Sequence, residues 1–190
     1  MGTRPITDRV KESIFNILGS RLGTLGTLPD VRVLDLFAGA GSFGLEALSR
    51  GARFCLFVER GRQALPTLRD NIRRLGLSRE EAAISTGDAW SVSYGTAASG
   101  RNPGSIADAP AGDASRFGLM FVDPPYRDVE DTLRMLKRLD QLAEGLADDG
   151  LIVFRHELMT SFPADMLERL DAVDRRDFGA MRVHWLGRKG

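Results

Sequence analysis

The residues whose types suggest chemistry most directly are the tetrapeptide Asp123-Pro124-Pro125-Tyr126, which follows an apolar run at 117–122. The run predicts a strand, so a carboxylate, a turn stiffened by two prolines and an aromatic ring stand together at a strand end. Asp123 and the Pro124 carbonyl can accept the N–H groups of a planar amine, and both contacts strengthen as positive charge grows on its nitrogen. Tyr126 offers a face on which a base can stack. The tetrapeptide therefore favours chemistry on a planar amino group.

A glycine-rich segment upstream has the pattern of a nucleotide-cofactor loop. Gly39, Gly41 and Gly44 fit G-x-G-x-x-G between an expected strand and an expected helix. Glycine at these positions lets the backbone turn tightly and approach a ligand closely. Glu59 ends the next expected strand, about twenty residues further on, where a carboxylate can accept the hydroxyl groups of a ribose. Sheets that bind NAD and sheets that bind S-adenosylmethionine share this pattern.

Two further carboxylates favour S-adenosylmethionine over NAD. Asp35 lies shortly before the loop, where it would repel a pyrophosphate but can bind the ammonium group of a methionine moiety. Asp88 ends the third expected strand and can accept from an adenine amino group; the alternative is that both carboxylates are turn and cap residues. The residues expected to bind S-adenosylmethionine are Asp35, Phe37, Gly39, Gly41, Glu59, Asp88 and Ala89. With the tetrapeptide 123–126 as the catalytic motif, the sequence predicts methyl transfer to a planar exocyclic nitrogen.

Alternating strands and helices must position these residues. Strands are expected at 31–37, 54–58, 83–85, 117–122, 151–155, 172–178 and 181–186, and longer helices at 8–20, 43–50, 63–75 and 129–146. Repeated strand–helix units predict an α/β, Rossmann-like fold, with a mostly parallel seven-stranded sheet and helices on both faces. The closing pair has no helix between its strands, so the last strand is expected to run antiparallel.

Local signals give the expected element boundaries. Thr7 or Asp8 can cap the first helix and Gly19 can end it. The helix at 129–146 carries a leucine stripe, and Asp149-Gly150 is expected to turn into the next strand. A short helix is expected near 164–170. The leucines of the stripe are Leu133, Leu136, Leu139, Leu142 and Leu146.

The bulk properties are typical of a single domain spanning residues 1–190. Residues 1–28 are expected to form an N-terminal helix and linker, and the Gly-, Ala-, Ser- and Asp-rich segment 91–116 a flexible insertion. The formal net charge is zero, which counts against a large non-specific nucleic-acid footprint. Arginines at 69, 73 and 74 fit either a local basic patch or a solvated helix face.

Other features bear on location and cofactors. No apolar run is long enough to span a bilayer, and residues 1–7 lack the apolar core of a signal peptide. Cys55, the one cysteine, is expected to be a buried core thiol. His156 and His184 are expected to be satisfied or surface histidines, and no cluster has the spacing of metal ligands. We therefore expect a cytoplasmic monomer with no metal.

The motifs resemble a known family. D-x-F-x-G-x-G and [DN]-P-P-[YFW] are shared by the class I S-adenosylmethionine-dependent methyltransferases. More narrowly, the segments 4–18 and 33–51 resemble the RsmD-type enzymes, which are bacterial 16S rRNA guanine-N2 methyltransferases; the similarity covers most of residues 4–155. The resemblance implies that Asp35 to Gly41 hold the methionine part of the cofactor, Glu59 its ribose, and Asp88 and Ala89 its adenine. It implies that residues 123–126 hold the target guanine, with 16S rRNA or the small ribosomal subunit as partner.

The sequence departs from the family pattern at three places. Family members usually carry a basic, glycine-containing segment before Arg4, whereas only Met1-Gly-Thr precedes it here, so we expect a shortened N-terminus or weaker RNA binding. The segment 91–116 is longer than the family's usual connection. Tyr126 stands where Phe is common, and both can stack.

Three alternatives to rRNA methylation stay open. The acceptor can be another planar amine, such as adenine N6 in DNA or a protein glutamine, although glutamine methylation would prefer Asn at 123 and no spare domain is seen for DNA recognition. The chain can be a non-catalytic RNA-binding module, against which the intact carboxylates argue. It can also be an NAD oxidoreductase, which leaves the tetrapeptide 123–126 without a role.

Overall fold

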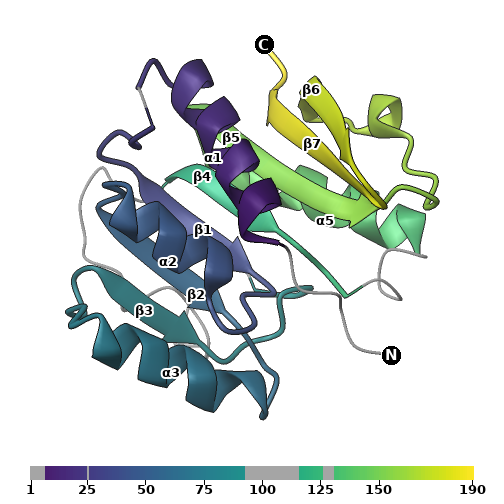
Figure 1. Ribbon diagram of the computed structural model, residues 1–190. Helices are drawn as coiled ribbons and strands as arrows, with labels where there is room; N and C mark the ends of the chain where they lie inside the picture. Colours follow the sequence, from purple (N-terminus) through teal and green to yellow (C-terminus); the bar gives the residue numbers. More distant parts are fainter. Residues whose placement is uncertain (1–6, 25, 93–115, 126–130) are drawn as a thin grey trace.

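The computed structural model describes residues 7–24, 26–92, 116–125 and 131–190. Within these ranges seven strands form one sheet in the order β3-β2-β1-β4-β5-β7-β6 (Figure 1). The strands are β1 (Arg32–Leu36), β2 (Phe54–Val58), β3 (Ala82–Ser85), β4 (Phe117–Val122), β5 (Leu146–Glu157), β6 (Leu170–Phe178) and β7 (Met181–Arg188). β7 pairs antiparallel with both β5 and β6, while the other pairs are parallel. The predicted sheet, including its antiparallel last strand, is confirmed.

Helices cover both faces of this sheet. α1 (Asp8–Arg21), α2 (Ser42–Ser49) and α3 (Ala64–Arg74) lie on one face, and α5 (Thr132–Leu142) lies on the other (Figure 1). On the first face the rings of Phe15 and Phe43 pack against Phe121, with centroids 5.5 and 4.8 Å away. On the second face Met135 and Leu139 of α5 are fully buried. Two apolar layers thus fix the strands from either side.

The strand order creates a crevice at the carboxyl edge of the sheet. From β1 the chain moves outward to β2 and β3, then returns to place β4 on the other side of β1. Neighbouring crossovers therefore leave in opposite directions between β1 and β4, and ligands of doubly wound sheets bind at such a switch point. Asp35 lies near the end of β1 and Asp123 directly follows β4. The topology brings the two predicted motifs together.

The predicted helix at 129–146 is too long at its carboxyl end. α5 ends at Leu142, a 3-10 turn η2 (Ala143–Gly145) follows, and Leu146 already pairs with Phe117 as the first residue of β5. The predicted turn at Asp149-Gly150 is therefore wrong, since these residues lie inside β5, where the register against β4 shifts. Leucine 133 of the expected stripe is 63% exposed. A repeat of leucines cannot distinguish a helical stripe from a helix end followed by a buried strand start.

Two other predicted boundaries are wrong. α1 continues through Gly19 to Arg21, and the left-handed glycine that follows its end is Gly23, with a φ of 69°. The predicted helix at 164–170 is only a 3-10 turn, η3 (Ala164–Met166), because the buried Leu170 already pairs with Arg188 at the start of β6.

Two smaller expectations are met within the described residues. Thr7 caps α1, with its hydroxyl accepting from the Val10 N–H. Cys55 is fully buried in β2, where burial raises the pKa of its thiol well above the usual value. Most of the expected insertion at 91–116, and Tyr126, lie outside the described residues. No described helix has both the length and the apolarity needed to cross a membrane.

Candidate functional site

A cavity of about 540 Å³ opens at the switch point of the sheet. Its lining comes from the carboxyl ends of β1, β2, β3, β4 and β5, and its size lies in the range of ligand pockets. Four carboxylates and two guanidinium groups are among the lining groups: Asp35, Glu59, Asp88, Asp123, Arg60 and Arg155. Phe37, Gly39, Ala89 and Pro125 of the predicted site also line it, whereas Gly41 and Pro124 are not among its lining residues.

The loop after β1 is shaped by left-handed backbone conformations. Gly39 and Gly41 have φ values of 56° and 88°, which glycine adopts at little cost, and Gly41 is the N-cap of α2. Phe37 also has a positive φ, of 60°, which is strained for a bulky side chain and costs about 1–3 kcal/mol. Its ring packs edge-on against Trp90 at 5.4 Å. Strain of this kind is concentrated at functional sites, and here it stands in the cavity wall.

Asp35 is a buried carboxylate that joins the loop to α2. It is 2% exposed, and its Oδ2 accepts the Gly44 N–H at 2.9 Å. Gly44 lies in the first turn of α2, where backbone N–H groups lack helical partners, so Asp35 caps this helix from the neighbouring strand. Burial raises the pKa of Asp35 to about 7; the Gly44 hydrogen bond opposes the rise, and the charges of Asp123 and Glu59 add to it. The alternative prediction, that Asp35 is a cap residue, is therefore correct. The same carboxylate also lines the cavity.

Glu59 follows β2 and ties the glycine loop to the second crossover. Its Oε2 accepts the Gly39 N–H at 2.7 Å, and its Oε1 accepts the Gly61 N–H. A carboxylate has about four acceptor positions, so Glu59 retains some for a ligand. The spacing of Glu59 from the glycine loop predicts a carboxylate at the end of β2. In the structure Glu59 lines the cavity together with Gly39.

Asp88 follows β3 and also has a local partner. Its Oδ1 accepts the Trp90 N–H at 3.1 Å, and its Oδ2 forms an ion pair with Arg60 at 2.9 Å. Asp88 therefore also acts as a cap residue, as the alternative prediction held. Because Asp88 and Ala89 line the cavity on the β3 side, they remain available to one end of an elongated ligand.

Asp123 meets a partner that the sequence analysis did not identify. Arg155 of β5 donates from Nε to Asp123 Oδ1 and from Nη2 to Oδ2, both at 2.6 Å. The Arg155 side chain is 5% exposed and that of Asp123 is 22% exposed. The signal that could have found Arg155 is an arginine directly after the apolar run 151–154, where a strand reaches the same sheet edge as Asp123. Arg60, directly after Glu59, was also missed.

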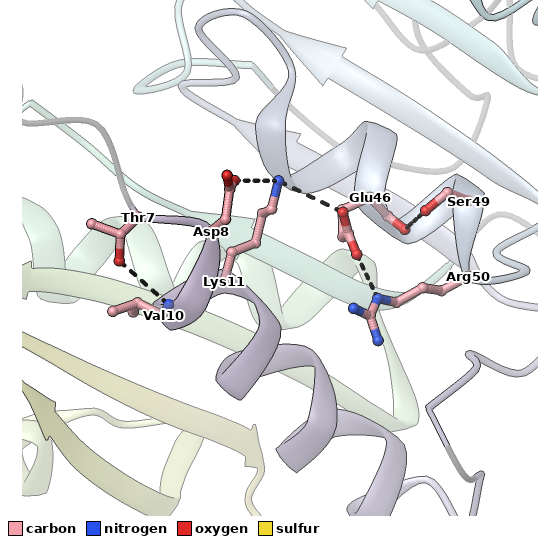
Figure 2. Close-up of polar contacts among 7 residues, drawn as sticks. All are labelled: Thr7, Asp8, Val10, Lys11, Glu46, Ser49 and Arg50. Carbon is pink, nitrogen blue, oxygen red and sulfur yellow. Dashed lines mark hydrogen bonds and ion pairs between the residues drawn. The ribbon is translucent and has the colours of Figure 1, made fainter.

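The first turn of α1 is linked to α2 by a chain of charges (Figure 2). Lys11 Nζ lies 3.6 Å from carboxylate oxygens of both Asp8 and Glu46. Glu46 also accepts from Arg50 Nε at 2.7 Å, and the Arg50 guanidinium lies over the Phe15 ring at 4.9 Å. These contacts hold α1 against the helix that begins at the glycine loop. Asp8 itself is fully exposed and Thr7 serves as the cap of α1.

Comparison with known proteins identifies the family. A family model described as "Conserved hypothetical protein 95" matches residues 1–187. The chain belongs to this family. One relative is a protein of Bacillus subtilis named "Putative rRNA methyltransferase YlbH", 38% identical over 161 residues that cover 85% of this chain and 75% of the relative. Another, from Escherichia coli, is named "Ribosomal RNA small subunit methyltransferase D" and is 30% identical, covering 85% and 68% of the two chains.

Solved structures agree with this placement in the Conserved hypothetical protein 95 family. "Putative methyltransferase yhhF from Escherichia coli" is 27% identical, with a TM-score of 0.71 over 99% of this chain and 88% of the other. A ribosomal protein L11 methylase from Lactobacillus delbrueckii is 14% identical, with a TM-score of 0.63 over 95% and 79%; it supports the fold alone. The resemblance noted in the sequence is thereby confirmed, and the fold is that of the class I methyltransferases.

Proposed function

We propose that this protein transfers a methyl group from S-adenosylmethionine to the exocyclic N2 of a guanine in 16S ribosomal RNA. The observation that carries the proposal is that the predicted cofactor carboxylates Asp35, Glu59 and Asp88 share one cavity with Asp123. The relative named ribosomal RNA small subunit methyltransferase D supports the choice of rRNA. The proposal covers a cytoplasmic monomer that acts on free 16S rRNA or on the small subunit.

The charge of the cavity fits S-adenosylmethionine. Four carboxylates against two guanidinium groups leave an excess of negative charge among the described lining residues. S-adenosylmethionine carries a sulfonium and an ammonium group, whereas the pyrophosphate of NAD is anionic and would be repelled by Asp35. Among the described residues no cation contributes to the pKa of Asp35, which burial raises, and a bound ammonium group would lower that pKa. The NAD alternative is therefore disfavoured on electrostatic grounds.

Different residues along the carboxyl edge of the sheet bind different parts of S-adenosylmethionine. We assign the methionine end to Asp35, Phe37 and the loop containing Gly39 and Gly41. Glu59 accepts the ribose hydroxyls, and Asp88 with Ala89 binds the adenine. When bound, S-adenosylmethionine supplies an electrophilic methyl group on sulfur.

Asp123 and its neighbours act on the acceptor. The Asp123 carboxylate accepts an N–H of the guanine amino group and stabilises the positive charge that develops on nitrogen. Pro124 is not among the cavity lining residues, and its role as a second acceptor through its carbonyl is assigned from the sequence alone. Pro125 limits the motion of the turn. Tyr126 stacks on the base, an assignment that rests on the sequence alone. The methylated amine then loses a proton to water.

A labelled-methyl experiment tests this function. Small ribosomal subunits lacking base methylation are incubated with labelled S-adenosylmethionine, and the nucleosides are identified by mass spectrometry. Wild type is expected to form N2-methylguanosine. Methyl transfer to DNA adenine or to protein glutamine, in parallel reactions, would replace the proposed acceptor. Failure to bind S-adenosylmethionine in calorimetry would favour the RNA-binding module instead.

The variant Asp123→Asn is expected to lower kcat by on the order of 10²-fold or more, because the amide loses the charge that opposes the developing cation. S-adenosylmethionine affinity should change by less than about threefold, which is less than the loss of a hydrogen bond to a charged group would cause. Asp177→Asn serves as the control, since Asp177 is an exposed aspartate that pairs with Arg182 away from the cavity. An affinity loss as large as the rate loss would contradict the role given to Asp123.

A further inference from the structure

The ion pair between Asp123 and Arg155 differs in setting from other pairs of the described chain. Arg155 grips both carboxylate oxygens at 2.6 Å, and its side chain is 5% exposed. The pair of Arg182 with Asp177 has the same two-pronged geometry, at 2.7 and 2.9 Å, but its side chains are 26% and 46% exposed. Only the first of these two pairs has both partners in the cavity lining. A desolvated pair at a reaction site calls for an explanation beyond surface charge.

The geometry fixes how Asp123 presents its oxygens. Two parallel N–H···O bonds set the plane of the carboxylate and use one acceptor position on each oxygen. Each oxygen keeps another position for a second donor. Arg155 is itself held, because its Nη1 lies 3.1 Å from Met181 Sδ at the start of β7. A rigid fork from β5 therefore sets the orientation of a carboxylate that stands on the turn after β4.

The charges around Asp123 explain why a cation is needed there. Asp35 of β1 shares the cavity with it, and the negative charge of Asp123 contributes to the raised pKa of Asp35. Glu59 and Asp88, from the ends of β2 and β3, add to the negative potential, while Arg60 pairs with Asp88. On α1, Lys11 pairs with Asp8 and Glu46 instead. Burial raises the pKa of Asp123, and Arg155 opposes that rise through its charge and its hydrogen bonds.

We propose that Arg155 is a positioning residue for methyl transfer, which orients the Asp123 carboxylate and keeps it a hydrogen-bond acceptor toward the amino group to be methylated. This inference rests on the proposed function. A protonated Asp123 would present an O–H donor to the amino group. In this role Arg155 acts on the reaction through Asp123.

The test compares Arg155→Gln and Arg155→Lys with the matched control Arg182→Gln. Arg155→Gln is expected to lower kcat by on the order of 10²-fold, the scale for a displaced catalytic group, with S-adenosylmethionine affinity changed less than about threefold. Arg155→Lys keeps the charge but not the fork, so its rate should fall between wild type and the glutamine variant. The acid limb of the kcat profile should move to higher pH in Arg155→Gln and less in Arg155→Lys. Arg182→Gln should keep the wild-type rate and profile.

Two further measurements distinguish failure of this inference from loss of folding and from failure of the proposed function. The double variant Asp123→Asn, Arg155→Gln removes both charges and should unfold nearer the wild-type temperature than either single variant, yet stay inactive. Carbon-13 carboxyl spectra of Asp123 follow its titration directly, and in Arg155→Gln the midpoint should move to higher pH. If wild type methylates no RNA, the proposed function fails. The titration of Asp123 alone then tests whether Arg155 keeps that carboxylate unprotonated. An unshifted titration, or a wild-type rate in Arg155→Gln, would overturn the inference.

Discussion

Three of the carboxylates that line the cavity also hold the backbone that builds it. Asp35 accepts from Gly44 in α2, Glu59 accepts from Gly39 in the loop, and Asp88 accepts from Trp90. Removing such a carboxylate therefore disturbs the fold and the site together, since a buried or partly buried backbone N–H loses its partner. An alanine substitution at Asp35 or Glu59 cannot separate the two effects. Measurements that follow protonation or charge, with isosteric amides as variants, are better suited to this site.

Asp35 should make S-adenosylmethionine binding depend on pH. Its pKa in the free protein is about 7, raised first by burial, and a bound ammonium group would lower it again. Below about pH 7 the free carboxyl is increasingly protonated, so affinity should fall by up to about tenfold per pH unit. Binding near neutral pH should release a proton. Calorimetry in buffers of different ionisation enthalpy measures that proton.

The control for this effect is a comparison of two amide variants. Asp35→Asn should bind more weakly and show neither the proton release nor the pH dependence below neutrality. Asp88→Asn is also expected to bind more weakly, but it should keep both, because Asp35 is still present. Proton release that persists in Asp35→Asn would assign the linkage to another group and remove the ammonium role from Asp35.

The packing of α2 on β2 decides how the glycine loop is presented. A Cβ added at Gly44 would lie 2.5 Å from Cys55 Sγ and closer still to the Phe57 ring, both in the buried strand β2. Gly44 is thus the residue that lets the helix approach the sheet, as the third glycine of such loops does. Neither neighbour can retreat easily, because both side chains are fully buried.

Gly44→Ala should therefore destabilise the protein by about 1–3 kcal/mol through overpacking. The helix would be pushed from β2, so its first-turn bond to Asp35 should weaken and S-adenosylmethionine affinity should fall with it. Ser49→Ala, at an exposed position of the same helix, is the control and should leave both quantities near wild type. Chemical denaturation and calorimetry measure the two effects. A Gly44→Ala protein with wild-type stability would show that the helix can shift freely.

The sequence allowed the strands and most helices to be predicted because each carries a local signal. β2 and β4 are apolar runs that lie between polar residues, and the bounds expected for both strands agree with the structure. The region 142–150 was mispredicted because its outcome depends on pairing with β4, which no local pattern records. Leu146 looks helical beside Leu139 and Leu142, yet it pairs with Phe117.

In the candidate site, too, features with a local sequence signal were predicted and features set by strand pairing were not. The positions of Asp35, Glu59 and Asp88 followed from the rule that ligands bind at the carboxyl ends of parallel strands. Arg155 also lies near the carboxyl end of a strand, but its contact with Asp123 could not be predicted, because the pairing of β4 with β5 sets the distance between them. The surface alternative for His156 and His184 was wrong for a similar reason, since both are buried where β5 meets β7.

The histidine pair bears on the stability of the molecule as a whole, because His156 and His184 are the two histidines of the chain. Their Nε2 atoms lie 3.0 Å apart, and His156 Nδ1 lies 2.8 Å from the Glu157 carbonyl. A carbonyl only accepts, so His156 carries its proton on Nδ1 and accepts at Nε2 from His184. His184 Nδ1 is then a bare acceptor, with no partner among the described residues. His156 must be unprotonated at Nε2 to accept this bond, and a proton on His184 Nδ1 would bury an N–H donor with no partner among the described residues.

The pair should make the folded protein sensitive to acid. Burial lowers the pKa of His184 to about 4, with smaller contributions from the charges of His156, Arg175 and Arg182, and burial also lowers the pKa of His156. The unfolded chain binds protons first, near its ordinary histidine pKa. The contribution of the neutral histidine pair to stability is therefore fully present above about pH 6.5 and is lost as the pH falls toward about 4. At about pH 5 the loss from His184 alone should be about 2 kcal/mol.

Asp35 contributes in the opposite direction, because its raised pKa stabilises the folded state as the pH falls below about 7. The histidine effect must therefore be measured as a difference between variants. His184→Phe fits the ring cluster with Phe154 and Phe162 and removes one titration. Urea unfolding between about pH 7.5 and pH 5 should show a smaller loss of stability in His184→Phe than in wild type. Equal losses in the two proteins would mean that the buried rings do not set the acid limit of this fold.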